Sequence, residues 1–486
     1  MADLFLAIDV GSTSVKAAVF DGAGQCLSRF AQSYPTARPS STEATQNPDD
    51  WMRLIRAALS QFAGEKLGGA LGFGSICSQV NTHVFVDKNG AALAPAILWQ
   101  DIRAAREAAT LDAMMTPAEK IKYLGSPMTI DASHPLARMA WMARNHPDIW
   151  QQTAYVLLPK DYCLWHLTGV LASDPLSNVG LVGPDLRYVG PILDLVEGAA
   201  QRMAPLREIT DTVGQISPAF GLPAVQMING TMDGWMGLYG AGAGQAGQMV
   251  YLSGTSEILG TSSPHVAGTA GIIVFPDVGG MRLHAGPTQS GGASQLWFCK
   301  AAGVDIASLS QLLLDTPRRS PTPLFLPQLA GERAPLWNPN LRGAFLGLDG
   351  SMGATDLARA VLEGVALSAR HVLGAITASS GVDAMVLKCG GGGFASAAWG
   401  QIRADVLNKS LTRLAANEPG LVGAAALAAF GAGGHSTLAG AQAQFAQYDM
   451  VWHPNPDNRA LYDDLFGIYT DAIAANDAIG RRIAQL

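Results

Sequence analysis

The chain opens on two apolar runs that are separated by a short polar turn. Residues 4–8 are apolar throughout, with Leu or Ile at alternate positions, which is typical of a strand buried on both faces. A second apolar run, Val15 to Phe20, follows the turn Gly11-Ser12-Thr13-Ser14 and ends at an Asp21-Gly22 hairpin signal. The pattern predicts a strand–turn–strand hairpin over residues 4–21.

Strand and helix patterns then alternate along the chain. Apolar residues recur at helical spacing from Trp51 to Phe62, after an Asn47-Pro48 helix start. Strand signals follow at 70–79 and 83–87, and residues 104–170 have mainly helical patterns. This alternation is typical of an α/β architecture.

The opening pattern occurs a second time near the middle of the chain. Residues 248–261 read as an apolar strand, a Gly254-Thr255-Ser256 turn and another apolar strand. Gly11 and Gly254 are 243 residues apart, half of the 486 residues. A repeat at this distance predicts two related lobes, with domains at 1–244 and 245–486, each offering one turn to a shared cleft.

The first turn has the composition of an anion site. Backbone N–H groups and hydroxyls on the inside of a Gly-hydroxyl turn form a nest that binds phosphate. Asp9 would repel a phosphate unless a hard divalent cation lies between them, and Lys16 would add positive charge. An ordinary surface hairpin is the alternative interpretation.

Three further stretches carry candidate chemistry. Trp99 and Asp101 stand where an apolar run ends, a place where ligands bind in open α/β sheets. Asp233 begins an apolar helix, either as a simple cap or as a reactive carboxylate. The glycines at 390–393 permit close approach of a planar ligand such as adenine, or tight packing of helix against sheet.

Composition limits the class of protein. The net charge of −7 argues against nucleic-acid binding. The five cysteines contain no CxxC pair, so we expect reduced thiols in a cytoplasmic protein, with no transition-metal site. We find no signal peptide and no apolar run of ~18 residues, so the sequence predicts neither export nor a membrane span. There is no GxxxxGK[ST] loop, which excludes a P-loop enzyme.

Several motifs together resemble the FGGY family of carbohydrate kinases, from about residue 4 to about residue 432. The resemblance implies the two-lobed fold of the actin, hexokinase and heat-shock ATPase (ribonuclease H-like) group, with duplicated domains and a central cleft. Within the family, the segments LLPKDY, LTG and ASD are most similar to xylulokinase-type sequences. The motifs are AIDVGSTSVKAAVFD, LWQDIR, LPKDYCLWHLTGVLASD, NGTMDGWMG, YLSGTSEI, FLPQLAGERAPLWNPNLRGAFLGL and LKCGGGGFASAAWGQIRADVL.

The resemblance also implies roles for individual residues. Asp9 would hold Mg²⁺, and Asp233 would be the general base that accepts the proton of a sugar hydroxyl. The ATP phosphates would be bound by one turn from each lobe, with a glycine loop beneath the adenosine. These nucleotide-binding residues are Gly11, Ser12, Thr13, Lys16, Gly254, Thr255, Gly391, Gly392 and Gly393. The expected sugar-binding residues are Gln79, Val80, Asn81, Trp99 and Asp101.

The sugar pocket departs from the family pattern. Xylulokinases usually continue from the position of Gln79 with Met-His, and glycerol kinases with Arg-Glu, whereas this chain has Val80 and Asn81. We expect a ketopentose such as D-xylulose, with glycerol, ribulose or a deoxy sugar as alternatives. A non-catalytic, nucleotide-dependent sugar-binding regulator is the alternative from another class. For Asp101, a salt bridge with Arg103 and direct sugar contact are both open. Relatives are often dimers, so a homodimer is also an expectation.

Overall fold

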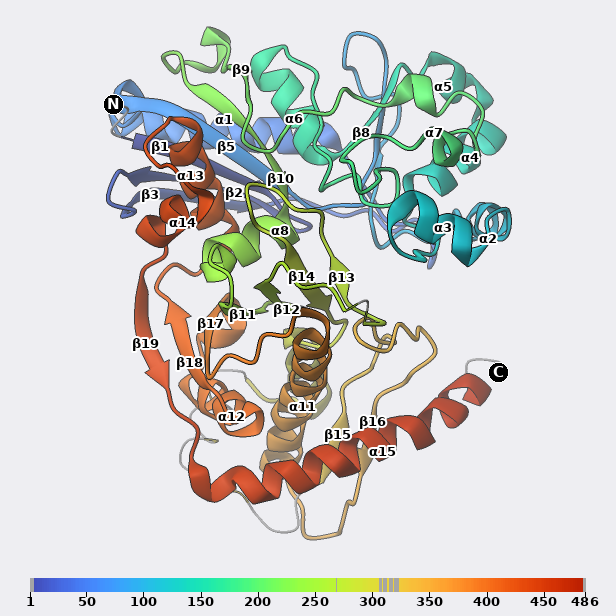
Figure 1. Cartoon of the computed structure of the whole chain (residues 1–486), viewed down its shortest axis with the longest axis vertical. Helices are drawn as coiled ribbons and strands as arrows, with labels where there is room; N and C mark the ends of the chain where they lie inside the picture. Colours follow the sequence, from blue (N-terminus) through green and yellow to red (C-terminus); the bar gives the residue numbers. More distant parts are fainter. Residues whose placement is uncertain are drawn as a thin grey trace. The chain divides into compact units, whose positions relative to one another are not determined.

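The computed structural model describes residues 4–483 except 268, 306–307, 309–312, 314–317 and 319–322. The chain forms two compact units of mixed α/β structure, each built on one large sheet (Figure 1). The first unit comprises Met1–Gly240 and Gly420–Phe445, and the second comprises Ala241–Pro419 and Ala446–Leu486. Gly420–Phe445 thus packs with the first unit, although it lies within the predicted second domain, 245–486.

The sheet of the first unit contains six strands in the order β3-β2-β1-β5-β10-β9. β2 lies antiparallel to β1, so the predicted opening hairpin is confirmed. β5 lies parallel to both β1 and β10. The strands are β1 (Leu4–Val10), β2 (Ser14–Asp21), β3 (Cys26–Ser33), β5 (Leu71–Ser78), β9 (Thr212–Gln215) and β10 (Gln226–Met232).

Both faces of β1 are covered, as the unbroken apolar run predicts. Leu6 and Ile8 share one buried core with Trp51 of helix α1. On the opposite face, Phe5 meets Phe445 of α14 edge to face, with the ring centroids 5.7 Å apart. The helices of this unit are α1 (Pro48–Gly64), α2 (Ala105–Ala113), α3 (Pro117–Leu124), α4 (Pro135–Asn145), α5 (Pro147–Gln152), α6 (Pro159–Thr168), α7 (Gly190–Leu193), α8 (Asp233–Leu238), α13 (Pro419–Gly431) and α14 (Leu438–Phe445).

The sheet of the second unit repeats this local arrangement. β11 and β12 form an antiparallel hairpin, and β17 lies parallel to β11 as β5 does to β1. The order is β13-β14-β12-β11-β17-β18-β19. The strands are β11 (Met249–Ser253), β12 (Glu257–Ser262), β13 (Ile273–Val274), β14 (Leu283–Pro287), β17 (Val386–Gly390), β18 (Ser410–Leu414) and β19 (Tyr448–Trp452).

The long helix α11 (Ala354–Ser380) is the centre of the second unit's core (Figure 1). Val372 and Ile376 pack on the sheet, while Val365 joins Tyr469 of α15 in a second core. By length and composition α11 could cross a membrane, but 72% of its most apolar window is buried, as expected of a core helix. The other helices here are α9 (Gly292–Ala302), α12 (Ala397–Leu407) and α15 (Arg459–Ile483).

Three two-stranded sheets complete the described β-structure. In the first unit, β4 pairs with β7 and β6 pairs with β8, and in the second β15 pairs with β16. β7 ends two residues before Trp99, so this side chain and Asp101 lie in the loop that follows a strand, as predicted. The bounds are β4 (Thr45–Gln46), β6 (Val84–Val86), β7 (Ala96–Ile97), β8 (Tyr155–Leu157), β15 (Leu324–Leu326) and β16 (Ala344–Leu346).

Candidate active site

The carboxyl ends of β1, β5 and β10 meet at one edge of the first sheet, because these neighbouring strands are parallel. The register places Asp9 beside Cys77, and Cys77 beside Thr231. Gln79 directly follows β5, and Asp233 directly follows β10. Burial, with the charges of Asp9 and Asp233, raises the pKa of the Cys77 thiol, so both carboxylates lie near this sulfur. The sheet therefore brings together three of the predicted site residues.

The turn between β1 and β2 stands at the same edge. It is closed by a hydrogen bond of 3.0 Å from the Gly11 N–H to the Ser14 carbonyl, and Thr13 is exposed at its tip. Lys16 on β2 is the register partner of Asp9 on β1. The turn, exposed at Thr13, thus joins two strands that carry one acidic and one basic residue as register partners.

A chain of hydrogen bonds joins this turn to the predicted sugar-binding residues. The Trp99 indole N–H donates to Ser12 Oγ at 2.9 Å. Gln46 Nε2 donates to the Ser12 carbonyl at 2.8 Å, and Gln46 Oε1 accepts from Gln79 Nε2 at 3.0 Å. Gln46 was not anticipated, because it lies in the two-residue strand β4 outside any motif.

Asp101 is buried in an ion pair. Its carboxylate accepts from the Arg103 guanidinium, with 2.7 Å between Arg103 Nη2 and Asp101 Oδ2. The same Oδ2 accepts the Ala44 N–H at 2.7 Å, and the side chain is only 1% exposed. The structure thus shows the salt bridge that was one of the two interpretations, and direct sugar contact by Asp101 stays a prediction.

Val80 and Asn81 are half-buried where the chain leaves β5. Asn81 has φ 54°, in the left-handed region that asparagine tolerates better than most residues. Its Nδ2 donates to Ser133 Oγ at 3.3 Å, and its carbonyl accepts from the guanidinium of Arg138. The loop with Val80 and Asn81, which departs from the family pattern, is therefore held by Ser133 and Arg138, just before and within helix α4.

Arg138 was not anticipated from the sequence. It is completely buried, and its guanidinium donates to the Ile97 carbonyl and to His83 Nδ1, both at 2.9 Å, and to the Leu98 carbonyl. Burial lowers the pKa of Arg138 to about 9, and burial and this guanidinium hold the pKa of His83 well below its ordinary value. A neutral His83 can accept the bond, so Arg138 ties the Asn81 loop to the loop before Trp99.

Asp233 begins α8 and is half-buried. Its Oδ1 accepts the N–H of Gly234 at 2.8 Å. Asp233 is the first helical residue after the N-cap Met232, so its charge matches the helix dipole without forming the cap, and it also lies at the edge shared with Asp9. A dipole-matched acid and a reactive carboxylate are compatible interpretations, because the bond to Gly234 orients the carboxylate.

The start of α13 also reaches this edge. An added Cβ on Gly420 would lie 3.5 Å from both Asp9 Oδ2 and Cys77 Sγ, so the backbone closely approaches the carboxylate. Residues 420–432 are Ala-rich, which is typical of a helix, and contain no motif that points to chemistry. A helix N-terminus carries partial positive charge, which stabilises the ionised Asp9 and favours anions beside it.

In the second unit, the turn between β11 and β12 is held by α9. Gly254 and Thr255 are exposed, and their carbonyls accept the N–H groups of Gly292 and Ala293, each at 2.9 Å. An added Cβ on Gly292 would lie 2.6 Å from the Gly254 oxygen. The turn and the start of α9 therefore pack too closely for a side chain between them.

A buried ion pair between Arg403 and Glu257 holds the strands that flank the Gly254 turn. Arg403 Nη2 donates to Glu257 Oε1 and to Ser253 Oγ, both at 2.6 Å, and Tyr251 donates to Glu257 Oε2 at 2.6 Å. Arg403 Nη1 donates to the Gly393 carbonyl at 2.7 Å. Burial raises the pKa of Glu257 against the opposing charge of Arg403. One guanidinium thus joins the Gly254 turn to the glycine loop after β17.

Close packing explains why two of the glycines in that loop, Gly391 and Gly393, have no side chain. An added Cβ on Gly391, at φ 91°, would lie 2.5 Å from the Ser253 carbonyl, and one on Gly393 would lie 2.1 Å from Ser253 Oγ. Gly392 is exposed, with nothing within 4 Å of an added Cβ. Of the three glycines in this loop that are predicted to bind nucleotide, only Gly392 has open space where a Cβ would be added.

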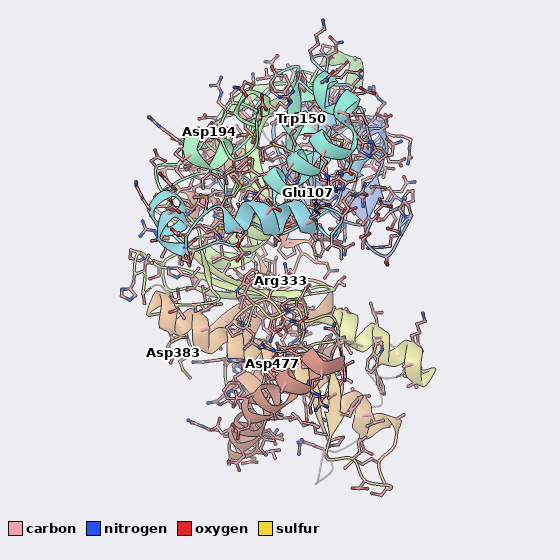
Figure 2. The ribbon with its side chains drawn as sticks, turned by 90° about the vertical axis from the view of Figure 1, so that its right-hand side faces the viewer. Glu107, Trp150, Asp194, Arg333, Asp383 and Asp477 are labelled. Carbon is pink, nitrogen blue, oxygen red and sulfur yellow. The ribbon has the colours of Figure 1, made fainter. Side chains whose placement is uncertain are left out.

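The GERAP motif supports the neighbouring loop of the second unit. Glu332 is buried and accepts the Gln289 N–H and the Ser290 hydroxyl, both at 2.6 Å. Arg333, labelled in Figure 2, donates from Nη2 to the Thr288 carbonyl at 2.7 Å. Thr288 Oγ1 in turn accepts the Glu257 N–H at 3.2 Å. The motif therefore positions backbone that contacts the hairpin of the Gly254 turn.

The donor set at Asp9 fits magnesium better than a transition metal. Among the described residues, no group of three His, Cys, Asp or Glu side chains could hold a metal ion. Mg²⁺ is commonly held by one or two carboxylates together with water and substrate phosphates. Asp9, at the end of β1 just before the turn predicted to bind phosphate, offers a carboxylate ligand of that kind.

Comparisons with known proteins agree with this geometry. Residues 4–240 match the model of the N-terminal domain of the FGGY family of carbohydrate kinases, and residues 249–432 match that of its C-terminal domain. The chain is 30% identical over 446 residues to a xylulose kinase of Klebsiella pneumoniae, covering 87% of this chain and 89% of the relative. It is 26% identical over 455 residues to a gluconokinase of Bacillus subtilis (strain 168), covering 89% and 88%.

A solved structure matches over almost the full chain. The crystal structure of a "xyloylose kinase" from Brucella ovis superimposes with a TM-score of 0.88 at 26% identity, covering 98% of this chain and 100% of that chain. The predicted α/β fold with two lobes is thereby confirmed.

Proposed function

The chain belongs to the FGGY family of carbohydrate kinases, and we propose that it transfers the γ-phosphoryl group of ATP to a hydroxyl of a neutral ketopentose such as D-xylulose. The resemblance read from the motifs is confirmed, and ATP-dependent sugar phosphorylation follows from the family. The choice of sugar is the proposal. The observation that carries it is that the guanidinium groups near Gln79 and Trp99 are engaged with protein partners, which favours a neutral sugar.

The side chains around Gln79 favour a neutral substrate over a sugar acid. A carboxylate such as that of gluconate requires a cationic partner, and guanidinium is the group best suited to it. Among the described residues near this wall, the guanidinium groups of Arg138, Arg103 and Arg38 all have protein partners: Arg138 donates to backbone carbonyls, Arg103 pairs with Asp101, and Arg38 donates to Gln100 Oε1. The Gln79 and Asn81 amides and the Trp99 indole suit hydroxyls.

Asp233 supplies the general base of the proposed reaction. A sugar hydroxyl is a weak nucleophile, and a carboxylate oxygen within ~3 Å takes its proton as the oxygen bonds to the γ-phosphorus. The bond from the γ-phosphorus to the β–γ bridging oxygen breaks, and ADP leaves. The Gly234 N–H holds one oxygen of Asp233, which fixes the orientation of the carboxylate.

The two turns bind the phosphates in this proposal. In the first unit the phosphates contact Gly11, Ser12, Thr13 and Lys16. In the second unit they contact Gly254 and Thr255, and the loop at 391–393 passes beneath the adenosine. Mg²⁺, when bound at Asp9, neutralises phosphate charge. Most of the acceleration comes from positioning and charge neutralisation, as in other phosphoryl transfers. The cytoplasmic location and the homodimer stay predictions from the sequence.

A coupled ADP-release assay at fixed Mg-ATP tests the proposal with D-xylulose, D-ribulose, glycerol and D-gluconate. We expect D-xylulose to give the highest kcat/KM. Asp233→Asn should retain ATP binding and lose about 10²- to 10⁴-fold in kcat. Asp194→Asn, an exposed aspartate of the same unit at the end of α7 (Figure 2), is the matched control and should not change the rate.

Each contrary outcome has a distinct meaning. A preference for D-gluconate would replace the ketopentose by a sugar acid. Near-normal turnover in Asp233→Asn would remove Asp233 from the role of base. A flat response over all four compounds would favour the non-catalytic sugar-binding regulator.

A further inference from the structure

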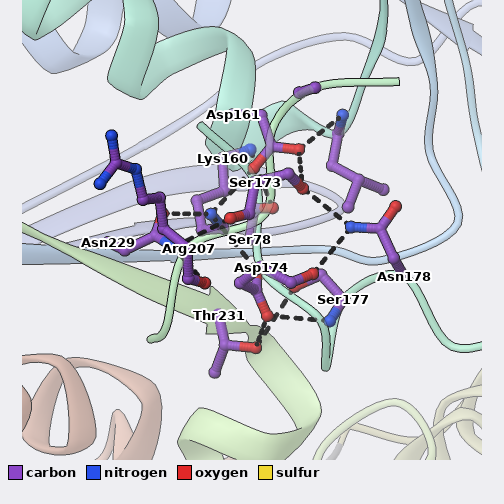
Figure 3. Close-up of polar contacts among 12 residues, drawn as sticks. Ser78, Lys160, Asp161, Ser173, Asp174, Ser177, Asn178, Arg207, Asn229 and Thr231 are labelled. Atoms are coloured by element: carbon purple, nitrogen blue, oxygen red, sulfur yellow. Dashed lines mark hydrogen bonds and ion pairs between the residues drawn. The ribbon is translucent and has the colours of Figure 1, made fainter. Parts of the chain in front are cut away.

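A cluster of charged side chains is buried in the first unit beside the sheet edge that carries Asp233 (Figure 3). Lys160, Asp161 and Asp174 are each at most 2% exposed. Lys160 Nζ lies 2.8 Å from Asp161 Oδ1, 3.3 Å from Asp174 Oδ2 and 3.1 Å from Asn229 Oδ1. The ammonium group therefore makes two ion pairs and one hydrogen bond, to residues of three different segments.

Such a cluster costs stability relative to an apolar core. Taking one cation and two carboxylates out of water is expensive, and their attraction repays the cost only in part. Burial lowers the pKa of Lys160, but Asp161 and Asp174 outweigh it, so the net shift is upward and the ammonium stays charged. The cluster is better explained by the geometry that it imposes than by the stability that it adds.

One arm of the cluster holds the end of β10. Asp174 Oδ1 accepts the Thr231 hydroxyl at 2.7 Å and the Ser177 N–H at 2.9 Å. Thr231 is two residues before Asp233. Figure 3 shows the Thr231 and Asp174 side chains directed toward each other, joined by a dashed line.

The contact between Asp174 and Thr231 lies at an irregular point of β10. The pairing of β10 with β5 shifts register between Ile228 and Thr231. Gly230 has φ 72°, and an added Cβ would lie 1.9 Å from the Ile76 oxygen. Asn229 and Thr231, the residues on either side of Gly230, are both bound by the cluster. The bulge that directs the last residues of β10 is therefore fixed on both sides.

The other arm holds the end of β5. The Lys160 backbone N–H donates to Ser78 Oγ at 3.0 Å, and Ser78 Oγ donates to the Gln79 carbonyl at 3.2 Å. Gln79 begins the predicted sugar-binding loop. Lys160 thus contacts the strand ends that precede both the expected base and the expected sugar-binding residues.

We propose that Lys160, Asp174 and Thr231 are positioning residues that set the Asp233 carboxylate against the sugar-binding loop after β5. The inference rests on the proposed function, because it assigns these residues to the step in which Asp233 takes the proton. None of the three contacts substrate in this role. Loss of the Thr231 hydroxyl shifts Asp233, which slows the chemical step and leaves the nucleotide-binding turns unchanged.

The test compares Thr231→Val, which keeps the shape of the side chain, with Thr231→Ser, which keeps the hydroxyl. We expect Thr231→Val to lose about 10- to 100-fold in kcat, the effect of a small misplacement of a reacting group. The KM for Mg-ATP should stay within about twofold, since the change spares the phosphate turns. Thr231→Ser should keep at least about half of the wild-type kcat, because its hydroxyl can still donate to Asp174.

The matched control is Thr261→Val in β12 of the second unit. Thr261 is also a fully buried strand threonine, and its hydroxyl donates to the Gln248 carbonyl at 2.8 Å. We expect this variant to lower the midpoint of thermal unfolding as Thr231→Val does, without a comparable loss of kcat. If Thr231→Val does not fold, Thr231→Ala against Thr231→Ser makes the same comparison with one hydroxyl removed.

The proposal is overturned if Thr231→Val keeps the wild-type kcat, or if Thr231→Ser and Thr231→Val lose kcat equally. It is also overturned if Thr261→Val loses as much kcat as Thr231→Val. Failure of the proposed function gives a different result, because the wild-type protein would then phosphorylate no sugar, or Asp233→Asn would stay active.

Discussion

The indole N–H of Trp99 donates to the hydroxyl of Ser12 at 2.9 Å, between residues 87 positions apart in the sequence. One residue belongs to the wall predicted to contact sugar, and the other to the turn predicted to bind phosphate. The carbonyl of the same Ser12 accepts from Gln46, which accepts from Gln79. The phosphate turn and the sugar wall are therefore parts of one hydrogen-bonded assembly within the first unit.

We predict that Trp99→Phe lowers kcat/KM for the sugar about five- to tenfold. The change keeps the aromatic ring and removes one donor, and a net hydrogen bond contributes about 1 kcal/mol. Steady-state kinetics with the preferred sugar measures the effect. Trp165→Phe is the matched control, because this indole packs on Gly90 and Tyr155 away from the turn. Equal losses in the two variants would contradict the assigned role of Trp99.

Much of the fold could be predicted because strand alternation is a local signal. The run 4–8 is apolar on every residue, and the structure buries both faces of β1. The packing of α13 and α14 with the first unit could not be predicted. Their Ala-rich sequences specify helices, but their return to the first unit depends on close fits such as that of Gly423 against Met236. Such complementarity between distant residues leaves no periodic pattern in the sequence.

Some residues of the candidate site could likewise be predicted from the sequence, and others could not. Asp9, Gln79 and Asp233 each follow or end an apolar run, so their meeting at the ends of parallel strands was predictable. Gln46 and Arg138 were missed, because a lone amide outside any motif or a lone arginine on a helix is usually solvated. Their roles follow from backbone carbonyls that only the folded chain brings within reach.

The stability of the first unit should fall as the pH decreases from about 6.5 to 4. His134 is buried, with Nδ1 accepting the Leu136 N–H at 3.3 Å, and burial lowers its pKa to about 4. The unfolded chain binds a proton near pH 6.5, so the stability is present above that pH and is lost toward pH 4. The contribution of this group is at most of the order of 3 kcal/mol. Asp131, Asp112 and Arg138 are the charged groups that also act on it.

Urea unfolding between pH 4 and 7 measures this dependence, with His134→Asn as the test variant. Asparagine is a good N-cap for α4 and does not titrate in this range. We expect the variant to show a clearly shallower dependence. Some slope remains, because His83 is also buried with a strongly lowered pKa. An unchanged slope would exclude His134 as a source of the pH dependence.

Two adjacent glycines of the loop after β17 should respond differently to alanine. Gly391 has φ 91°, and its added Cβ would meet the Ser253 carbonyl at 2.5 Å, so Gly391→Ala strains the backbone and lowers the midpoint of thermal unfolding. Gly392 has open space around an added Cβ, so Gly392→Ala leaves the fold intact. If the adenosine lies over this loop as predicted, the new methyl of Gly392→Ala raises the KM for ATP several-fold, with the sugar KM unchanged. Thermal unfolding and steady-state kinetics on both variants decide the matter. An unchanged ATP KM in Gly392→Ala would mean that the glycines serve packing alone, because the space left open at Gly392 would then not be occupied by nucleotide.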